Sequence, residues 1–318
     1  MPRRRRPVTV LVYRPDEAER YAGLVRGPRG AVRVAVASTP AEAEPLVPEI
    51  DALWAWKFPP GLYEKAGRLA WVQAMGAGVD SVLVPELPRH VTVTRSPGIF
   101  GPWMAEYVLG WCLWVTQRME TYREAQRERR WIGSVQPERL AGRTLVVVGL
   151  GDIGRSIARA ASAAGLRVVG VSRSGRAVKG VARVYRHSAL ARALAEGDFL
   201  ALVLPLTPET RGMIGAQAIG AMRREAWLIN VGRGPLVDED ALLSALRERR
   251  IAGAILDVFA VEPLPADHPF WAMENVVVTP HVSGPDLPEA IAPVFNENLA
   301  RFVAGRPLRH VVDRRRGY

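Results

Sequence analysis

The sequence is poor in residues that several protein classes require. Its one cysteine, Cys112, excludes an internal disulfide framework and favours a reducing compartment. It has no run of twenty apolar residues, which argues against a membrane-spanning helix. The apolar run near the start, Val8–Tyr13, is too short for a secretory signal. We therefore expect a cytoplasmic protein without a membrane partner.

Lysine is also scarce, with three residues among the 43 basic ones, although the net charge is +11. Seven of these charges lie in two terminal runs, arginines 3–6 and 314–316, so the rest of the chain carries +4. No helix-turn-helix, zinc-finger or aromatic–basic RNA-binding pattern accompanies them. We attribute the high arginine content to the amino-acid composition typical of the source genome, and we expect no nucleic-acid partner.

Short apolar, β-branched runs alternate with helix-like segments along the 318 residues. This alternation is typical of βαβ units and a parallel sheet. Pro/Gly-rich joints at 96–102 and 283–289 divide the pattern. We expect an α/β protein with two Rossmann/flavodoxin-like, doubly wound parallel-sheet domains and a cleft between them. Residues 1–97 and 285–318 would form a discontinuous substrate-binding domain, and residues 98–284 a dinucleotide-binding domain.

A strongly aromatic segment starts at Pro102 and runs into the polar stretch "ETYREAQRERRW". Proline suits the first turn of a helix, because its missing N–H has no partner there anyway. We expect a long helix followed by an arm that leaves the core. Such an aromatic helix suggests a subunit interface, and thus a homodimer, although packing between the two domains explains it equally well.

The segment "VVVGLGDIG" places Gly149, Gly151 and Gly154 between an apolar strand and a helix. In this context the glycines allow a tight turn and a close approach of the backbone to a pyrophosphate. The helix N-terminus then faces the negative charge. The pattern predicts a dinucleotide site; a purely structural strand–helix turn is the alternative.

The next strand ends in "VGVSRSG", where an NAD site usually carries an acidic residue. Here the positions read Ser172, Arg173 and Ser174. A guanidinium and two hydroxyls suit a 2′-phosphate, whereas a carboxylate would repel it. We expect NADP(H) to be preferred over NAD(H). Alternatively, Arg173 is an exposed surface charge.

Three charged side chains follow predicted strands further along. Arg233 lies in "NVGRGP", Glu262 in "DVFAVEPLP" and His281 in "VTPHVSG". The carboxyl ends of parallel strands form the ligand-binding edge of such sheets. A histidine can exchange the proton of a substrate hydroxyl, a carboxylate can orient it, and an arginine can hold a substrate carboxylate. Singly, each residue has a structural alternative: Arg233, for example, could pair with Asp238 or Asp240.

Together, the ordered motifs resemble those of the D-isomer-specific 2-hydroxyacid dehydrogenase family. They are "VQAMGAGVDSV", "SPGIFGPWMAEYVLG", "VVVGLGDIG", "LPLTPETRGMIG", "NVGRGPLVDEDAL", "LDVFAVEPLP" and "TPHVSG", and they extend over most of the chain. The segments "LWAWKFPPGL", Ser-Arg-Ser and "VVDRRRGY" look most like the glyoxylate/hydroxypyruvate reductase branch.

The resemblance implies an NADPH-dependent reduction of a small 2-keto acid to the D-2-hydroxy acid. It implies that Arg233 binds the substrate carboxylate and carbonyl, that His281 is the acid/base, and that Glu262 is its partner. It also implies further contacts: Asp257 to the nicotinamide carboxamide, Asp152 and Ile153 amides to the pyrophosphate, Pro205, Val231 and Gly232 along the cofactor, and Gly76, Ala77 and Gly78 to the substrate carboxylate.

Other functions are less consistent with the sequence. No tyrosine has a lysine four residues on, as a short-chain dehydrogenase requires, and one cysteine cannot supply the ligands of a zinc alcohol dehydrogenase. We expect no bound metal. Two alternatives stay open: a non-enzymatic dinucleotide sensor resembling the corepressors of the same family, and an NAD-dependent dehydrogenase of a larger 2-hydroxy acid.

Overall fold

The computed structural model describes residues 6–318, so arginines 3–5 of the N-terminal run lie outside the described residues. The chain divides into two units. The first unit contains the residues up to Ile99 together with Asp286–Tyr318, and the second contains Phe100–Pro285. Both are α/β units with parallel sheets, so the predicted fold class is confirmed.

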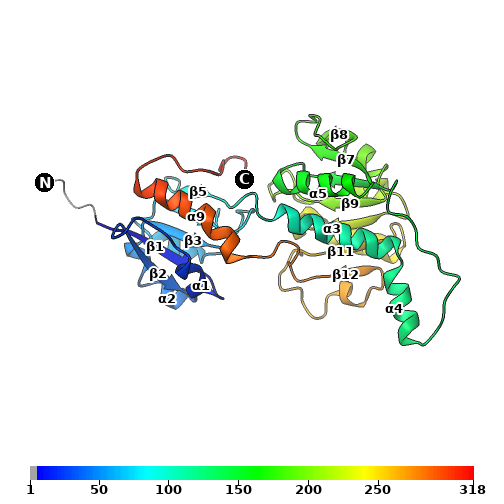
Figure 1. The fold of residues 1–318 in the computed structure, drawn as a ribbon, viewed down its shortest axis with the longest axis horizontal. Coiled ribbons are helices and arrows are strands. Elements are labelled where there is room, and N and C mark those ends of the chain that lie inside the picture. Colours follow the sequence, from blue (N-terminus) through cyan, green and yellow to red (C-terminus); the bar gives the residue numbers. More distant parts are fainter. Residues whose placement is uncertain (1–5) are drawn as a thin grey trace. The chain divides into compact units, whose positions relative to one another are not determined.

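The first unit has a five-stranded parallel sheet in the order β2-β1-β3-β4-β5 (Figure 1). This is the flavodoxin-like strand order, with the reversal between β1 and β3. Its strands are β1 Val8–Tyr13, β2 Val32–Ala37, β3 Ala52–Ala55, β4 Trp71–Ala74 and β5 Thr92–Thr94. Its helices are α1 Ala18–Gly23, α2 Pro40–Ala43 and α9 Pro288–Val303, with 3₁₀ turns at η1 Val47–Glu49 and η2 Pro60–Lys65.

Helix α9 returns to the first unit through aromatic packing. The ring of Phe295 stacks on Trp54 of β3 with centroids 4.2 Å apart, and on Trp71 of β4 at 5.3 Å. All three side chains are fully buried. The last helix thus packs on the strands formed by the first ninety or so residues, as its apolar pattern suggests.

Arg6 is the described residue of the N-terminal arginine run. It makes two hydrogen bonds to Asp51, which directly precedes β3.

The second unit has a seven-stranded sheet in the order β12-β11-β10-β9-β6-β7-β8, and every pair in it is parallel. The order reverses at β6, which pairs with β7 on one side and β9 on the other. In open α/β sheets this reversal opens the crevice where dinucleotides bind. The strands are β6 Thr144–Val148, β7 Arg167–Ser172, β8 Arg183–Arg186, β9 Phe199–Leu202, β10 Trp227–Asn230, β11 Gly253–Leu256 and β12 Val276–Val278.

Most helices of the second unit pack on this sheet, and α4 projects from it (Figure 1). They are α3 Gly101–Thr116, α4 Met119–Arg127, α5 Asp152–Ala163, α6 Leu190–Leu194, α7 Ala216–Ala221 and α8 Glu239–Arg247, with 3₁₀ turns at η3 His187–Ala189, η4 Gly234–Leu236 and η5 Pro269–Ala272. Figure 1 shows α3 beside α5. A side chain at Gly101 would collide with Ser156 of α5, so the two helices approach closely.

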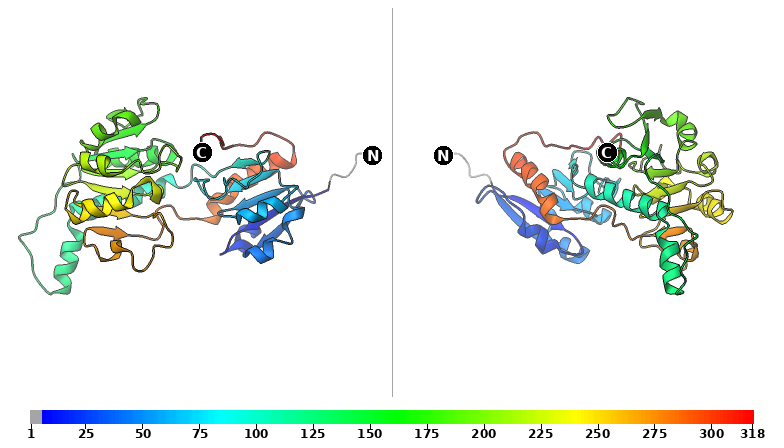
Figure 2. Two further views of the ribbon diagram at one scale, coloured as in Figure 1. Left: turned by 180° about the vertical axis from the view of Figure 1, so that it is seen from behind. Right: turned by 45° about the vertical axis from the view of Figure 1, so that its right-hand side comes forward.

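Helix α3, which contains the aromatic segment, ends just before the polar stretch that follows it in the sequence. Arg118 has a left-handed backbone, with φ of 53°, and breaks the segment into α3 and α4. Helix α4 then runs away from the sheet of the second unit (Figure 2). Within residues 6–318, no helix is both long and apolar enough to cross a membrane.

Candidate active site

The second unit brings the predicted charged residues to one edge of its sheet. The turn at Gly149 follows β6, Arg233 follows β10, Asp257 follows β11, and His281 follows β12. Because all these strands are parallel, their carboxyl ends lie on the same side. The glycine turn and the predicted site residues therefore share this edge.

The glycine turn after β6 has no room for side chains at two positions. Gly149 has φ of 109°, and a Cβ there would lie 2.4 Å from the carbonyl oxygen of Val203. A Cβ on Gly154 would lie 1.8 Å from the carbonyl oxygen of Gly149. Gly151 has open space around it and precedes Asp152 and Ile153, the first residues of α5. The turn fits a pyrophosphate at the helix N-terminus.

The turn after β7 presents hydroxyls and a guanidinium. The Ser172 hydroxyl oxygen accepts a hydrogen bond from the Gly175 N–H at 3.1 Å, and the Ser174 oxygen accepts one from the Arg176 N–H at 3.3 Å. Each hydroxyl can still donate its own proton, because a hydroxyl both accepts and donates. Arg173 and Ser174 are exposed and Ser172 is half-buried. The turn is therefore accessible and rich in donors, as a phosphate site requires.

His281 and Glu262 are in direct contact. The His281 ring Nδ1 lies 2.9 Å from Glu262 Oε2, and Glu262 Oε1 accepts a hydrogen bond from the Phe259 N–H at 2.9 Å. Burial acts to raise the pKa of Glu262. The two hydrogen bonds and the positive charges of His281 and Arg233 outweigh it and lower that pKa below its usual value. The carboxylate therefore stays ionised and can stabilise a protonated imidazole.

Arg233 is held at this edge by its neighbours in the chain. The amide of Asn230 accepts from the Gly232 N–H and donates to the Arg233 carbonyl, both at 3.1 Å. Gly234 packs so closely on the next loop that a Cβ would lie 1.9 Å from the Phe259 carbonyl carbon. This contact brings the Arg233 loop against the loop that leads to Glu262.

Asp257 is fully buried, and protein groups occupy both of its carboxylate oxygens. Its donors are the Thr279 hydroxyl and the N–H groups of Val282 and Ser283. The carboxylate thus organises the turn that carries His281. A contact with the nicotinamide carboxamide stays a prediction.

The three residues expected along the cofactor differ in exposure. Pro205 is half-buried after β9, and its carbonyl accepts from the Thr210 hydroxyl at 2.7 Å. Val231 and Gly232 are buried after β10, and a Cβ on Gly232 would meet Leu236 at 2.8 Å. The contacts of Pro205 and Gly232 are with other residues of the loops that follow β9 and β10.

The turn 76–78 lies in the first unit, directly after β4. A Cβ on Gly76 would lie 2.3 Å from the ring of Trp56, so a side chain there would require that ring to move. Gly76 is buried, while Ala77 and Gly78 are half-buried. The backbone of this turn is therefore accessible at its second and third residues.

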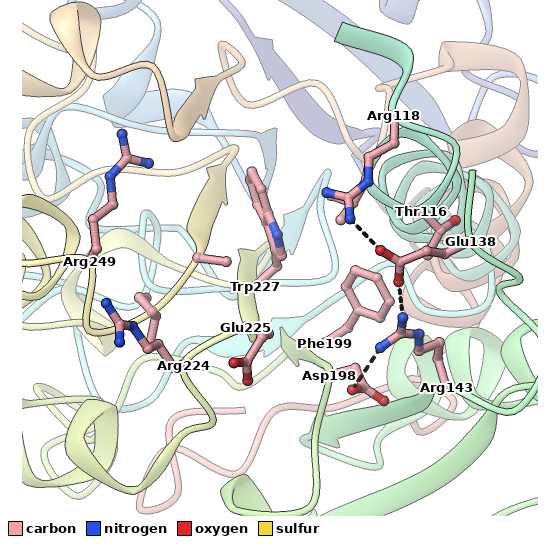
Figure 3. Close-up of a pocket in the computed structure, with 13 residues that line it drawn as sticks. Thr116, Arg118, Glu138, Arg143, Asp198, Phe199, Arg224, Glu225, Trp227 and Arg249 are labelled. Carbon is pink, nitrogen blue, oxygen red and sulfur yellow. Dashed lines mark hydrogen bonds and ion pairs between the residues drawn. The ribbon is translucent and has the colours of Figure 1, made fainter. Parts of the chain in front are cut away.

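A cavity of about 570 Å³ lies at the opposite edge of the second unit's sheet (Figure 3). It is lined by residues at the amino ends of strands, such as Phe199 and Trp227, and by the end of α3. An ion-pair chain runs along one side, from Arg118 through Glu138 and Arg143 to Asp198. None of the predicted site residues lines this cavity.

The comparison with known proteins decides the family. Residues 109–283 match the family described as "D-isomer specific 2-hydroxyacid dehydrogenase, NAD binding domain". The chain belongs to the D-isomer-specific 2-hydroxyacid dehydrogenase family. The predictions of family and of an oxidoreductase that binds a nicotinamide dinucleotide are thereby confirmed.

Relatives of this dehydrogenase are similar over nearly its whole length. It is 34% identical to glyoxylate/hydroxypyruvate reductase A of Serratia proteamaculans, over 98% of this chain and 100% of the relative. The structure of a family member from Xanthobacter autotrophicus in complex with NADPH and MES has a TM-score of 0.88 at 38% identity, covering 99% and 100% of the two chains. A glyoxylate/hydroxypyruvate reductase from Sinorhizobium meliloti in complex with NADP and sulfate has a TM-score of 0.88 at 35% identity, with the same coverage. These relatives confirm the resemblance to the glyoxylate/hydroxypyruvate reductase branch.

Sequence reasoning missed two basic residues of this dehydrogenase beside the 172–175 turn. Strand pairing places Arg186 of β8 opposite Ser172, and a Cβ on Gly175 would lie 2.7 Å from the Arg186 side chain. His187 follows, and burial together with the charge of Arg173 lowers its pKa. Among residues 6–318, no cluster of His, Cys, Asp or Glu is arranged to hold a metal ion.

We predict that Gly154→Ala strongly weakens dinucleotide binding by this dehydrogenase, because its new Cβ would overlap the Gly149 carbonyl. The dissociation constants of NADPH and NADH, measured by nicotinamide fluorescence, should both rise by at least about a hundredfold, which corresponds to ~2.7 kcal/mol. Gly220→Ala is the matched control, since nothing lies within 4 Å of a Cβ there. Unchanged affinity in a folded Gly154→Ala variant would contradict the assignment of the turn.

Proposed function

We propose that this protein reduces a small 2-keto acid of the glyoxylate or hydroxypyruvate type to the D-2-hydroxy acid, using NADPH. The observation that carries the proposal is the His281–Glu262 pair, which lies at the nucleotide-binding edge of the sheet with Arg233 near enough to lower the pKa of Glu262. The reductases similar to this chain support the substrate class.

Bound NADPH would supply the hydride to the carbonyl carbon of the substrate. The protein's own groups would do the remaining chemistry. His281 would hold its Nδ1 proton toward Glu262 and give a proton from Nε2 to the carbonyl oxygen as it gains electrons. Arg233 would bind the substrate carboxylate and polarise the carbonyl. Backbone N–H groups of the turn 76–78 would also donate hydrogen bonds to the substrate carboxylate. This turn consists of Gly76, Ala77 and Gly78.

The cofactor would lie along the turn formed by Gly149, Gly151, Asp152, Ile153 and Gly154, beside Pro205, Val231 and Gly232. Asp257 would contact the carboxamide group of the nicotinamide. We infer a preference for NADP(H), because Ser172, Arg173 and Ser174 offer donors and positive charge where an acidic residue would select NAD(H). Arg186, which lies against the same turn, would add a second guanidinium.

We further propose a cytoplasmic homodimer. Apolar side chains are exposed on α3 and on the arm after it, including Trp103, Leu113, Met119 and the almost wholly exposed Trp131. Exposed aromatic and apolar residues are common at interfaces between subunits. The cavity at the end of α3 provides a concave surface with charges of both signs beside them.

Turnover with a panel of 2-keto acids tests the reaction. We expect NADPH oxidation with glyoxylate and hydroxypyruvate to exceed that with pyruvate and bulkier 2-keto acids. Preference for a bulky acid with NADH would favour the alternative dehydrogenase. No oxidation of either cofactor with any acid would favour the dinucleotide sensor.

His281→Ala tests the acid/base assignment in the same assay. We expect the turnover number to fall about 10²–10⁴-fold, the usual contribution of a positioned proton donor. The dissociation constant of NADPH should change little, since the glycine turn is untouched. His310→Asn is the control, because His310 is exposed and asparagine tolerates its left-handed backbone. Full turnover without His281 would refute its role.

Arg173→Asp tests the cofactor preference. We expect the variant to lose roughly ten- to a hundredfold in NADPH affinity, the range for a lost charged hydrogen bond, and far less in NADH affinity. Arg183→Asp is the matched control, because the Arg183 guanidinium bonds the Tyr185 hydroxyl at 3.0 Å and covers its ring. Equal losses of affinity for NADPH and NADH would show that Arg173 is an exposed surface charge without a role in cofactor preference.

Light scattering tests the oligomer. We expect a mass of about twice the 34.9 kDa of the chain. Trp131→Asp should shift the equilibrium toward the monomer, because it places a charge in the interface. Trp271→Asp, which changes an exposed tryptophan on η5, should leave the mass unchanged. A monomeric unmodified protein would exclude the homodimer.

A further inference from the structure

The backbone of His281 has a conformation that few residues with side chains adopt. Its φ is 54°, in the left-handed region. The His281 N–H donates to the Asp257 carbonyl at 2.9 Å, with a second contact to the Thr279 carbonyl at 3.1 Å. Such a conformation persists only where surrounding contacts hold it. The groups that fix this turn therefore decide where the imidazole points.

The Asp257 carboxylate supplies most of these contacts. Its Oδ1 accepts from the Val282 N–H at 2.9 Å and from the Thr279 hydroxyl at 2.6 Å, and its Oδ2 accepts from the Ser283 N–H at 2.9 Å. The side chain is 0% exposed, so these donors must replace its hydration. The residues on both sides of His281 are thus tied to one buried carboxylate.

The network continues to a residue on α3. The Thr279 hydroxyl has one proton, and it points toward Asp257, so its oxygen must accept from the next partner. That partner is the Tyr107 hydroxyl, at 2.6 Å. Burial raises the pKa of Tyr107 to about 12, so the phenol keeps its proton and remains a donor over the working pH range. The donor direction is therefore fixed from Tyr107 through Thr279 to Asp257.

We propose that Tyr107 is a positioning residue for the proton-transfer step, acting through Thr279 and Asp257 to fix the turn that carries His281. The inference rests on the proposed function of His281 as acid/base. Tyr107 would neither bind substrate nor transfer a proton to it. It would keep the Thr279 hydroxyl pointing at Asp257, and hydrogen bonds in such a chain strengthen one another.

Four variants test the proposal in the full-length protein. Tyr107→Phe removes the first donor, and Thr279→Val removes the link. Thr279→Ser is the conservative variant that keeps the hydroxyl. Tyr122→Phe is the matched control, because it removes a phenol that donates to the Val135 carbonyl in the arm at 2.8 Å. Turnover number, Michaelis constant for glyoxylate and NADPH dissociation constant are measured for each, with hydrogen exchange of the 279–283 segment.

We expect Tyr107→Phe to lower the turnover number about tenfold and Thr279→Val to lower it by up to about a hundredfold, the range for a small displacement of a reacting group. The NADPH dissociation constant should stay within about twofold. Exchange at Val282 and Ser283 should speed up in both variants. Thr279→Ser and Tyr122→Phe should behave like the unmodified protein.

The double variant Tyr107→Phe, Thr279→Val decides whether the two residues act in series. If Tyr107 acts through Thr279, the double variant loses no more turnover than Thr279→Val alone, because the link is already absent. Additive losses would overturn the proposal, and so would unchanged turnover and exchange in Tyr107→Phe. If the unmodified protein reduced no 2-keto acid, the proposed function would fail, while the exchange measurements would still test the network.

Discussion

Parallel pairing in the second unit is the constraint on which the site depends. It brings the carboxyl ends of β6, β10, β11 and β12 to one edge, although these strands are far apart in the sequence. The residues after each strand must then turn sharply without leaving backbone groups unpaired. Buried polar side chains solve this problem, with Asn230 bonding the loop after β10 and Asp257 bonding the turn after β12. The loops that hold Arg233 and His281 are thus tied by hydrogen bonds to buried side chains of the second unit.

The charges at this edge fit the anionic substrate of the proposed function. Glu262 is less exposed than a free surface carboxylate, and burial alone would favour its neutral form. The hydrogen bond from His281 and the charge of Arg233 reverse that preference. With Glu262 ionised, the pair with His281 can carry a proton at little electrostatic cost, and Arg233 adds positive charge nearby. A carboxylate with an adjacent carbonyl matches this distribution better than a neutral or cationic ligand does.

Much of this could be predicted from the sequence, because buried parallel strands read as continuous apolar runs and charged residues directly after them mark the ligand edge. The apolar pattern does not indicate strand β8, since its four residues, Arg183–Arg186, include two arginines and lie at the sheet edge. That omission also hid Arg186 and His187, whose places beside Ser172 and Arg173 follow from strand register. The bonds between Tyr107, Thr279 and Asp257 were equally invisible, because hydrogen bonds between distant segments leave no periodic pattern.

Helix α3 joins the two edges of the second unit's sheet. Tyr107 bonds the turn after β12 at the carboxyl edge, while Thr116, at the end of the same helix, lines the cavity at the amino edge. The two residues are nine positions apart, which corresponds to about 14 Å of continuous helix. Packing against α5 supports α3 along this stretch. The same helix therefore supplies a partner of the His281 turn at one edge of the sheet and part of the cavity lining at the other.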